Sequence, residues 1–206
     1  MKIVVFGATG ATGKYLVPLL LKAGHEVTAL ARSPNKVDQS GGTVRIIEGD
    51  ARDPATIAKA VAGQDIVMST FGSRSLKADD IQEVFMKNLV AAMHDAGVQR
   101  LIDLSAWGTG DSYASANFFF KIIMATILKA NFVDKNKGEA QVIDSDILYT
   151  FVRPGRLTNG PAKGNVRASL DGKGLRKSIS RRDVVSFMVD QIKDQSWIRK
   201  APLIGY

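Results

Sequence analysis

The sequence predicts an α/β fold, in which one doubly wound parallel sheet carries helices on both faces. Strand-like and helix-like segments alternate from the first residues onward, which is typical of parallel strands joined by helical crossovers. A turn rich in glycine follows the first predicted strand. The 206 residues provide enough chain for one well-buried domain but too little for two. We therefore expect a single domain over residues 1–206.

The first half of the chain predicts its elements in a regular order. The apolar run at residues 2–6 predicts a buried strand, and an apolar stripe at residues 16, 17, 20 and 21 predicts a helix over 11–23. Gly24 suits the end of that helix, and Pro18 is expected to kink it because proline has no amide N–H. Four further strands are predicted at 26–31, 43–48, 65–70 and 99–105. Two further helices are predicted at 54–62 and 79–96.

The second half is less regular. It predicts a very apolar helix, a polar helix, a strand and a last helix, at 115–130, 133–145, 147–152 and 181–193. A stretch rich in glycine and proline occupies 154–174, and no linker or repeat divides the chain. We expect the irregular region of about 106–178 to form the substrate side of the one domain.

Composition excludes several kinds of site. The chain has no cysteine and two histidines, so we expect no disulfide, no nucleophilic cysteine and no metal site. No signal peptide is recognisable, and the apolar stretch at 118–128 is shorter than the roughly 20 residues of a membrane span, so we expect a cytoplasmic protein. The net charge of +8 is compatible with nucleic-acid binding, but the basic residues are scattered and no such motif accompanies them. A positive field also attracts a polyanionic cofactor and acidic substrates.

The turn after the first strand carries the main functional signal. It reads Gly7-Ala8-Thr9-Gly10-Ala11-Thr12-Gly13, between a buried strand and an amphipathic helix. Glycines let the backbone approach a pyrophosphate, which the free amides and the dipole of the following helix stabilise. A P-loop does not fit, because Tyr15 follows Lys14 where a serine or threonine is needed. The turn therefore predicts a Rossmann-type dinucleotide site. The alternative is a purely structural turn that binds no ligand.

Arg32 indicates which dinucleotide is bound. An acidic residue after the second strand usually accepts from the ribose hydroxyl of NAD, whereas this chain has Arg32 there. A guanidinium pairs with a 2′-phosphate in a bidentate manner. We therefore expect NADP(H), with NAD(H) as the alternative if Arg32 is only a solvated loop residue.

With these residues, the chain resembles the atypical short-chain dehydrogenase/reductases. It is most similar to the NAD(P)H-binding group that includes biliverdin-IXβ reductase/flavin reductase and the NmrA-like proteins. The resemblance extends from the glycine turn to the C-terminal part, through the short segments at residues 31–32, 48–51, 62–65, 96–98, 153–155, 170–172 and 179–183.

The resemblance implies further cofactor-binding residues. Asp50 and Ala51 would border the adenine, and Thr70, Phe71 and Gly72 would line the adenosine and ribose. Ser105 would lie near the nicotinamide, with Pro154 and Gly155 beside it. These residues follow predicted strands, whose carboxyl ends bind ligands in open α/β sheets.

The catalytic residues are less clear from the sequence. The family usually combines a serine with Tyr-x-x-x-Lys, and no such motif stands here. Ser105 is the available hydroxyl acid, although Ala106 follows it where a second hydroxyl is common. Lys135 either faces the cofactor or is a solvent-facing residue of a polar helix. Asp103 is either a general base or a buried structural carboxylate.

Hydride transfer to a flavin or quinone needs little acid–base help, because the acceptor delocalises the added charge. Trp107, Gly108 and Gly110 are expected to help stack such a planar acceptor. A group of apolar residues either covers this acceptor as a lid or belongs to the core or to a subunit interface. These residues are Phe118, Phe119, Phe120, Ile123 and Ile127.

These observations lead to three hypotheses. The first is an NADPH-dependent reductase of flavins, quinones or tetrapyrrole-like acceptors, which takes a small molecule as its partner. The second, favoured by the missing Tyr-x-x-x-Lys, is a regulatory or sensor protein of the NmrA-like kind. The third is a sugar-nucleotide epimerase-like enzyme, for which 206 residues leave little room.

Overall fold

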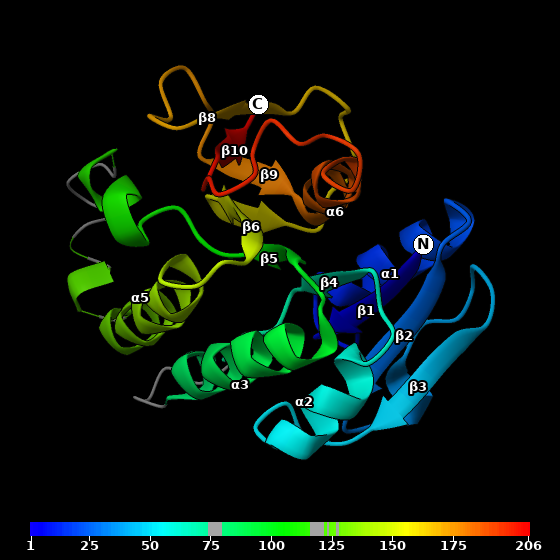
Figure 1. Cartoon of the computed structure of the whole chain (residues 1–206). Helices are drawn as coiled ribbons and strands as arrows, with labels where there is room; N and C mark the ends of the chain where they lie inside the picture. Colours follow the sequence, from blue (N-terminus) through cyan, green and yellow to red (C-terminus); the bar gives the residue numbers. More distant parts are fainter. Residues whose placement is uncertain (74–79, 116–121, 123, 127) are drawn as a thin grey trace.

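The computed structural model describes residues 1–73, 80–115, 122, 124–126 and 128–206, and it has the doubly wound α/β architecture that the sequence predicts (Figure 1). The main sheet has eight strands in the order β3-β2-β1-β4-β5-β6-β10-β8. All neighbouring strands in it are parallel except β10 and β8. Its strands are β1 (Lys2–Phe6), β2 (Glu26–Ala31), β3 (Val44–Glu48), β4 (Ile66–Ser69), β5 (Arg100–Leu104), β6 (Leu148–Pro154), β8 (Arg167–Ser169) and β10 (Leu203–Gly205).

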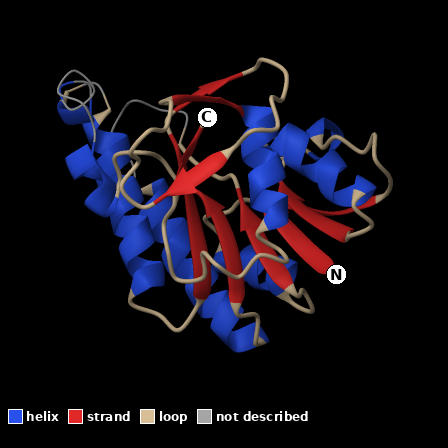
Figure 2. Cartoon of the chain, turned by 90° about the horizontal axis from the view of Figure 1, so that it is seen from above, coloured by secondary structure: helices blue, strands red, loops and turns tan. Residues whose placement is uncertain are grey.

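Helices cover both faces of this sheet (Figure 2). One face packs against α1 (Gly13–Lys22) and α6 (Arg181–Asp190). The other packs against α2 (Pro54–Val61), α3 (Ile81–Ala96) and α5 (Lys129–Ile143). Alternate residues of each strand serve the two layers, so that Ile3 and Val5 lie in one core, and Val4 and Phe6 in the other. Two short 3-10 helices, η1 (Pro34–Lys36) and η2 (Gly110–Ser115), belong to the connections.

The strand register brings the carboxyl ends of the strands to one edge of the sheet. Phe6 of β1 is opposite Leu30 of β2 and Ser69 of β4, and Ser69 is opposite Asp103 of β5. The line continues to Ile47 of β3 on one side and to Phe151 of β6 on the other. The residues just beyond this line, from six different strands, therefore meet at one edge.

Most predicted elements are confirmed within one or two residues, and the differences have identifiable causes. The first helix begins at Gly13 rather than at residue 11, because the glycine turn uses residues 11 and 12. The sequence missed four three-residue strands: β8, β10, and the small parallel pair β7 (Arg156–Thr158) and β9 (Ser178–Ser180). The polar helix begins at Lys129, earlier than predicted. Residues 116–121, 123 and 127 of the predicted apolar helix at 115–130, which include all five expected lid residues, lie outside the described residues.

Candidate functional site

The glycine turn is tightly packed against the end of β4 and against itself. Gly7 has a φ of +79°, and a Cβ there would lie 2.7 Å from the backbone nitrogen of Phe71. A Cβ on Gly13 would lie 2.1 Å from the carbonyl oxygen of Gly7. Real Cβ atoms do not approach backbone atoms this closely, so both positions require glycine.

The same turn leaves amide donors at the start of α1. The amide of Gly10 donates to Gly7 O at 2.9 Å, and that of Lys14 donates to Gly10 O at 3.2 Å. Within the part of the chain that the structure describes, no backbone carbonyl accepts from the amides of Ala11, Thr12 and Gly13. Three such amides at a helix N-terminus fit an anionic pyrophosphate. The half-buried Thr9 completes the turn.

Arg32 and Asp50 lie together where β2 and β3 end, at the part of this edge that is predicted to hold the adenosine. Arg32 directly follows β2, its side chain is 78% exposed, and its Nη1 lies 4.0 Å from Asp50 Oδ2. Asp50 is itself held by the amide of Arg52, which donates to Oδ1 at 2.9 Å. The exposed guanidinium thus follows the strand next to β1, whose end carries the glycine turn, while Ala51 is buried in the core beneath.

The end of β4 forms the wall next to the turn. The Thr70 hydroxyl donates to Gly7 O at 3.2 Å, and Thr70 N donates to Phe6 O at 2.9 Å. The Phe71 ring packs on Phe85 of α3 at a centroid distance of 4.6 Å, and Gly72 is exposed beside it. The structure thus brings Thr70 and the backbone of Phe71 against the glycine turn, whereas Gly72 lies next to the Gln82 side chain.

The opposite end of the edge is built from the loops after β5 and β6. Ser105 N donates to Val152 O and Trp107 N to Pro154 O, both at 2.8 Å. Gly155 is needed for close packing, since a Cβ there would lie 2.5 Å from Lys177 O. Ser105 and Pro154 are therefore neighbours, as the resemblance implied.

The Ser105 hydroxyl is hydrogen-bonded to a buried carboxylate. Ser105 Oγ donates to Glu139 Oε1 in a short hydrogen bond, and Thr109 Oγ1 lies 3.0 Å from the same oxygen. Because its one proton points to Glu139, Ser105 presents lone pairs rather than a proton to the site. This differs from the acid expected from the sequence, and it makes Ser105 an acceptor for a donor group.

Glu139 in turn belongs to a buried ion pair that the sequence analysis missed. Arg153 Nη2 donates to Glu139 Oε2 at 2.7 Å, and both side chains are 3% exposed. Arg153 also pairs with the exposed Asp111. The sequence did contain a signal for this pair. Arg153 directly follows the predicted apolar strand at 147–152, and an arginine buried at the end of such a strand requires a buried anion. Glu139 lies four residues after Lys135, on the same face of the predicted polar helix, and this face supplies the anion.

Lys135 points toward the end of β5, which disfavours the solvent-facing alternative, and its contact with the cofactor stays a prediction. Its side chain is half-buried, and Nζ donates to Leu104 O at 3.3 Å. Its charge also acts on Asp103, a fully buried carboxyl on β5. Burial raises the pKa of Asp103 to about 6, and the negative charge of Glu139 adds to the increase; Lys135 and a hydrogen bond from Ser69 act in the opposite direction. Asp103, whose partner the sequence did not give, thus lies beside the lysine.

The stability of the fold should depend on the ionisation of Asp103. Because its pKa rises from 3.8 to about 6 on folding, the folded state binds more protons than the unfolded state between these values. This contribution to stability is present below pH 4 and is lost as the pH rises to 6, by roughly 3 kcal/mol. Asp103→Asn stays neutral, so its stability relative to the wild type should increase across that window. Urea unfolding at pH 4.5 and 7 measures this difference, and equal differences at both pH values would contradict it.

The helices that carry these groups are fixed to one another by Asp134. This buried carboxylate accepts from the amides of Gln82 at 2.9 Å and Glu83 at 3.0 Å. It therefore caps the first turn of α3 from α5, where the N-cap residue Asp80 makes no side-chain capping hydrogen bond. This contact sets the position of Lys135 relative to β4 and β5.

Trp107 corrects one expectation about the acceptor. Its side chain is 2% exposed, its Nε1 donates to Ser115 Oγ at 2.9 Å, and Gly172 packs against its ring. A ring that is already covered offers no face for stacking. Gly108 and Gly110, in contrast, line a cavity of about 390 Å³.

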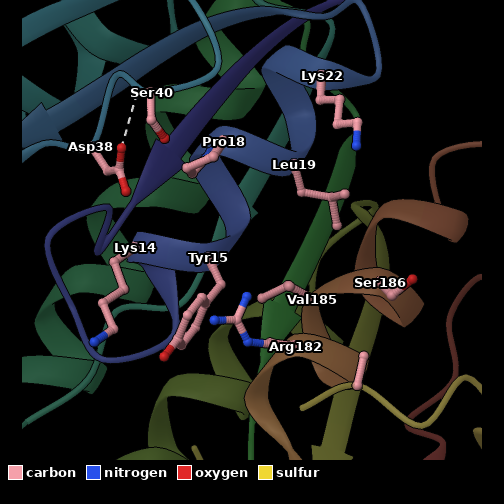
Figure 3. Close-up of a pocket in the computed structure, with 11 residues that line it drawn as sticks. Lys14, Tyr15, Pro18, Leu19, Lys22, Asp38, Ser40, Arg182, Val185 and Ser186 are labelled. Atoms are coloured by element: carbon pink, nitrogen blue, oxygen red, sulfur yellow. Dashed lines mark hydrogen bonds between the residues drawn. The ribbon is translucent and has the colours of Figure 1, made fainter.

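A second hollow lies between α1 and α6 (Figure 3). It has a volume of about 590 Å³, and the Arg182 guanidinium lies over the Tyr15 ring at 4.6 Å. No residue predicted to bind the cofactor lines it. Among the described residues, no cluster of three potential metal ligands exists, and no helix is long and apolar enough to span a membrane.

Comparisons with known proteins agree with this geometry. A family model described as NAD(P)H-binding matches residues 7–195. Eugenol synthase 1 of Petunia hybrida is 25% identical over 214 residues, which span 97% of this chain and 67% of that protein. The structure of ChuY, an anaerobillin reductase from Escherichia coli O157:H7, is similar with a TM-score of 0.84 at 21% identity, over 100% of this chain and 97% of that one. A wide-type short-chain dehydrogenase/reductase from Veillonella parvula in complex with NADP gives 0.81 at 21% identity, over 100% and 94%. At these identities the two structures show a shared fold.

Proposed function

Because the chain belongs to the NAD(P)H-binding family, we propose that it is an NADPH-dependent oxidoreductase that transfers hydride to a planar acceptor. The acceptor is a flavin, a quinone or a tetrapyrrole-like compound. The observation that carries this proposal is the convergence of the glycine turn, Ser105 and Lys135 at one edge of the sheet, in a chain without the Tyr-x-x-x-Lys motif. Such a site suits an acceptor that needs orientation more than proton transfer.

The residues at the edge fit the dinucleotide along its length. The amides of Ala11, Thr12 and Gly13 would hold the pyrophosphate, and Arg32 would pair with the 2′-phosphate. Ser105 would accept a hydrogen bond at the nicotinamide end. The bound cofactor supplies the hydride. The Lys135 ammonium stabilises negative charge on the reduced acceptor, which takes its proton from water.

Arg32 is expected to determine the preference for NADPH over NADH. Arg32→Asp replaces the cation by a carboxylate that repels the 2′-phosphate and accepts from a ribose hydroxyl. The ratio of NADPH to NADH affinity should fall by at least about tenfold. Arg32→Lys keeps the charge but loses the bidentate geometry, so its ratio should be intermediate. Fluorescence titrations with both dinucleotides measure the ratios; identical ratios in all three proteins would remove Arg32 from cofactor recognition.

The proposal as a whole is tested by a cofactor titration followed by an acceptor screen. NADPH is first titrated to obtain its affinity, and riboflavin, FMN, a quinone and biliverdin are then added in turn. Steady loss of the reduced-cofactor absorbance with at least one acceptor is the expected result. Tight NADPH binding without turnover on the whole panel would contradict the reductase.

That contradicting result would support the second candidate, a regulatory protein that senses NAD(P)H. One observation favours it: the Ser105 hydroxyl is committed to Glu139 and is not available as an acid. A sensor needs the turn and Arg32 but no acceptor site. A binding site for an acceptor therefore separates the two candidates.

A further inference from the structure

A cavity of about 390 Å³ lies beside the loop after β5. It lies between residues 108–113 and the first turns of α5. Most of its lining is apolar or aromatic, with Tyr113, Met124, Phe132 and Val133 among the described residues that line it. Its size is at the lower end of small-molecule pockets, so it suits a compact ring system.

Gly108 and Gly110 maintain the shape of this cavity. Gly108 has a φ of +113°, and a Cβ there would lie 2.3 Å from Met124 Sδ and 3.0 Å from Phe132 Cε1. The amide of Gly110 donates to Asn136 Oδ1 at 2.9 Å, which ties the loop to α5. The wall is therefore held by backbone and by packed side chains.

The charge of the cavity is positive. Lys129 is the single charged side chain among the described lining residues, and no carboxylate stands there. Within the described part of the chain, Lys129 forms no ion pair. A lysine without a counterion at the edge of an apolar pocket provides a binding position for an anionic group.

The loop and the helix that line the cavity also carry the groups proposed to act on the acceptor. Gly108 comes three residues after Ser105, and Asn136 is the neighbour of Lys135 on α5. The loop after β5 and helix α5 thus contribute residues both to the cavity and to the predicted reaction site. An acceptor in this cavity would extend from Lys129 toward the end of β5.

We propose that this cavity binds the acceptor, and that the acceptor is a compact conjugated ring system with an anionic arm, whose charge Lys129 recognises. This inference rests on the proposed function and names the substrate class of the same site. It follows that, of two acceptors with the same ring, the one with a phosphate binds better. FMN and riboflavin form such a pair, because they differ by one phosphate.

The test measures binding first and turnover second. Dissociation constants of FMN and riboflavin are obtained from flavin fluorescence with saturating NADP⁺ present, for the wild type, Lys129→Gln and Lys129→Glu. We expect the preference for FMN to fall about fivefold in Lys129→Gln and about 25-fold in Lys129→Glu. In the wild type it should also shrink with rising salt, because Lys129 is exposed.

Lys137→Gln is the matched control. Lys137 lies on the same helix, carries the same charge and pairs with Glu83 outside the cavity, so its loss should leave the preference unchanged. An equal change in Lys129→Gln and Lys137→Gln, or no flavin binding by the wild type, would overturn the inference. Binding with the expected preference but without NADPH oxidation would support the cavity and contradict the reductase.

Discussion

Replacing Gly13 with alanine is expected to weaken NADPH binding by at least about 100-fold and to destabilise the fold by roughly 3 kcal/mol. The new Cβ would lie 2.1 Å from Gly7 O and 2.8 Å from the Cα of Ala8. Both neighbours are backbone atoms of the turn, so no side chain can rotate away to make room. The turn must move, and the amides proposed to hold the pyrophosphate move with it.

A glycine in open space provides the control for Gly13→Ala. Gly160 has a single atom within 4 Å of an added Cβ, Thr158 Oγ1 at 4.0 Å, and its φ is not in the left-handed region. Gly160→Ala should therefore leave both properties nearly unchanged. NADPH fluorescence titration and urea unfolding measure the two effects. Wild-type affinity in Gly13→Ala would show that the turn does not contact the cofactor.

The second large effect is expected at the buried ion pair of Glu139 and Arg153. Glu139→Gln leaves the buried guanidinium with Asp111, whose side chain is 82% exposed, as its remaining anion. Removing one partner of a buried pair costs about 3–5 kcal/mol, because the other charge stays uncompensated in a low-dielectric interior. For a chain of this size, the melting temperature should fall by about 6–20 °C.

A double-mutant cycle separates the pair from the individual side chains. Arg153→Met removes the cation, and its stability loss should be similar to that of Glu139→Gln. The double variant should lose at least about 2 kcal/mol less than the sum of the single losses, because neither charge is then left alone. Calorimetric or urea unfolding of the four proteins gives the coupling energy. Additive losses would mean that the two side chains do not interact.

Local patterns in the sequence were sufficient for the first βαβ unit. The bounds of β1 and β2 are those predicted from the apolar runs, because each is a continuous buried strand with clear turn residues on both sides. The glycine turn was identified from three glycines at a strand–helix junction, and the packing of Gly7 and Gly13 explains why no other residue fits. The carboxyl-end residues followed from the alternation of strands and helices, since parallel strands end at one edge.

The short strands and the burial of Trp107 depend on contacts between distant parts of the chain. β8 pairs with β10, and β7 with β9, across about 20 to 35 residues, so three-residue segments without a pattern of their own become strands. Trp107 looked like a stacking platform in the sequence, and only the packing of Gly172 on its ring shows that it is covered.

The sequence by itself determined the class of fold, the dinucleotide turn and the positions of Arg32 and Ser105, because these follow from local periodicity and from the steric needs of glycine. Tertiary structure decided the direction of Lys135, the partner of Arg153 and the use of the Ser105 proton. A hydrogen bond or ion pair depends on where two separate elements bring their side chains, and α5, β5 and β6 meet only once the sheet has formed. Folding therefore decides which of the site's polar groups are donors and which are acceptors.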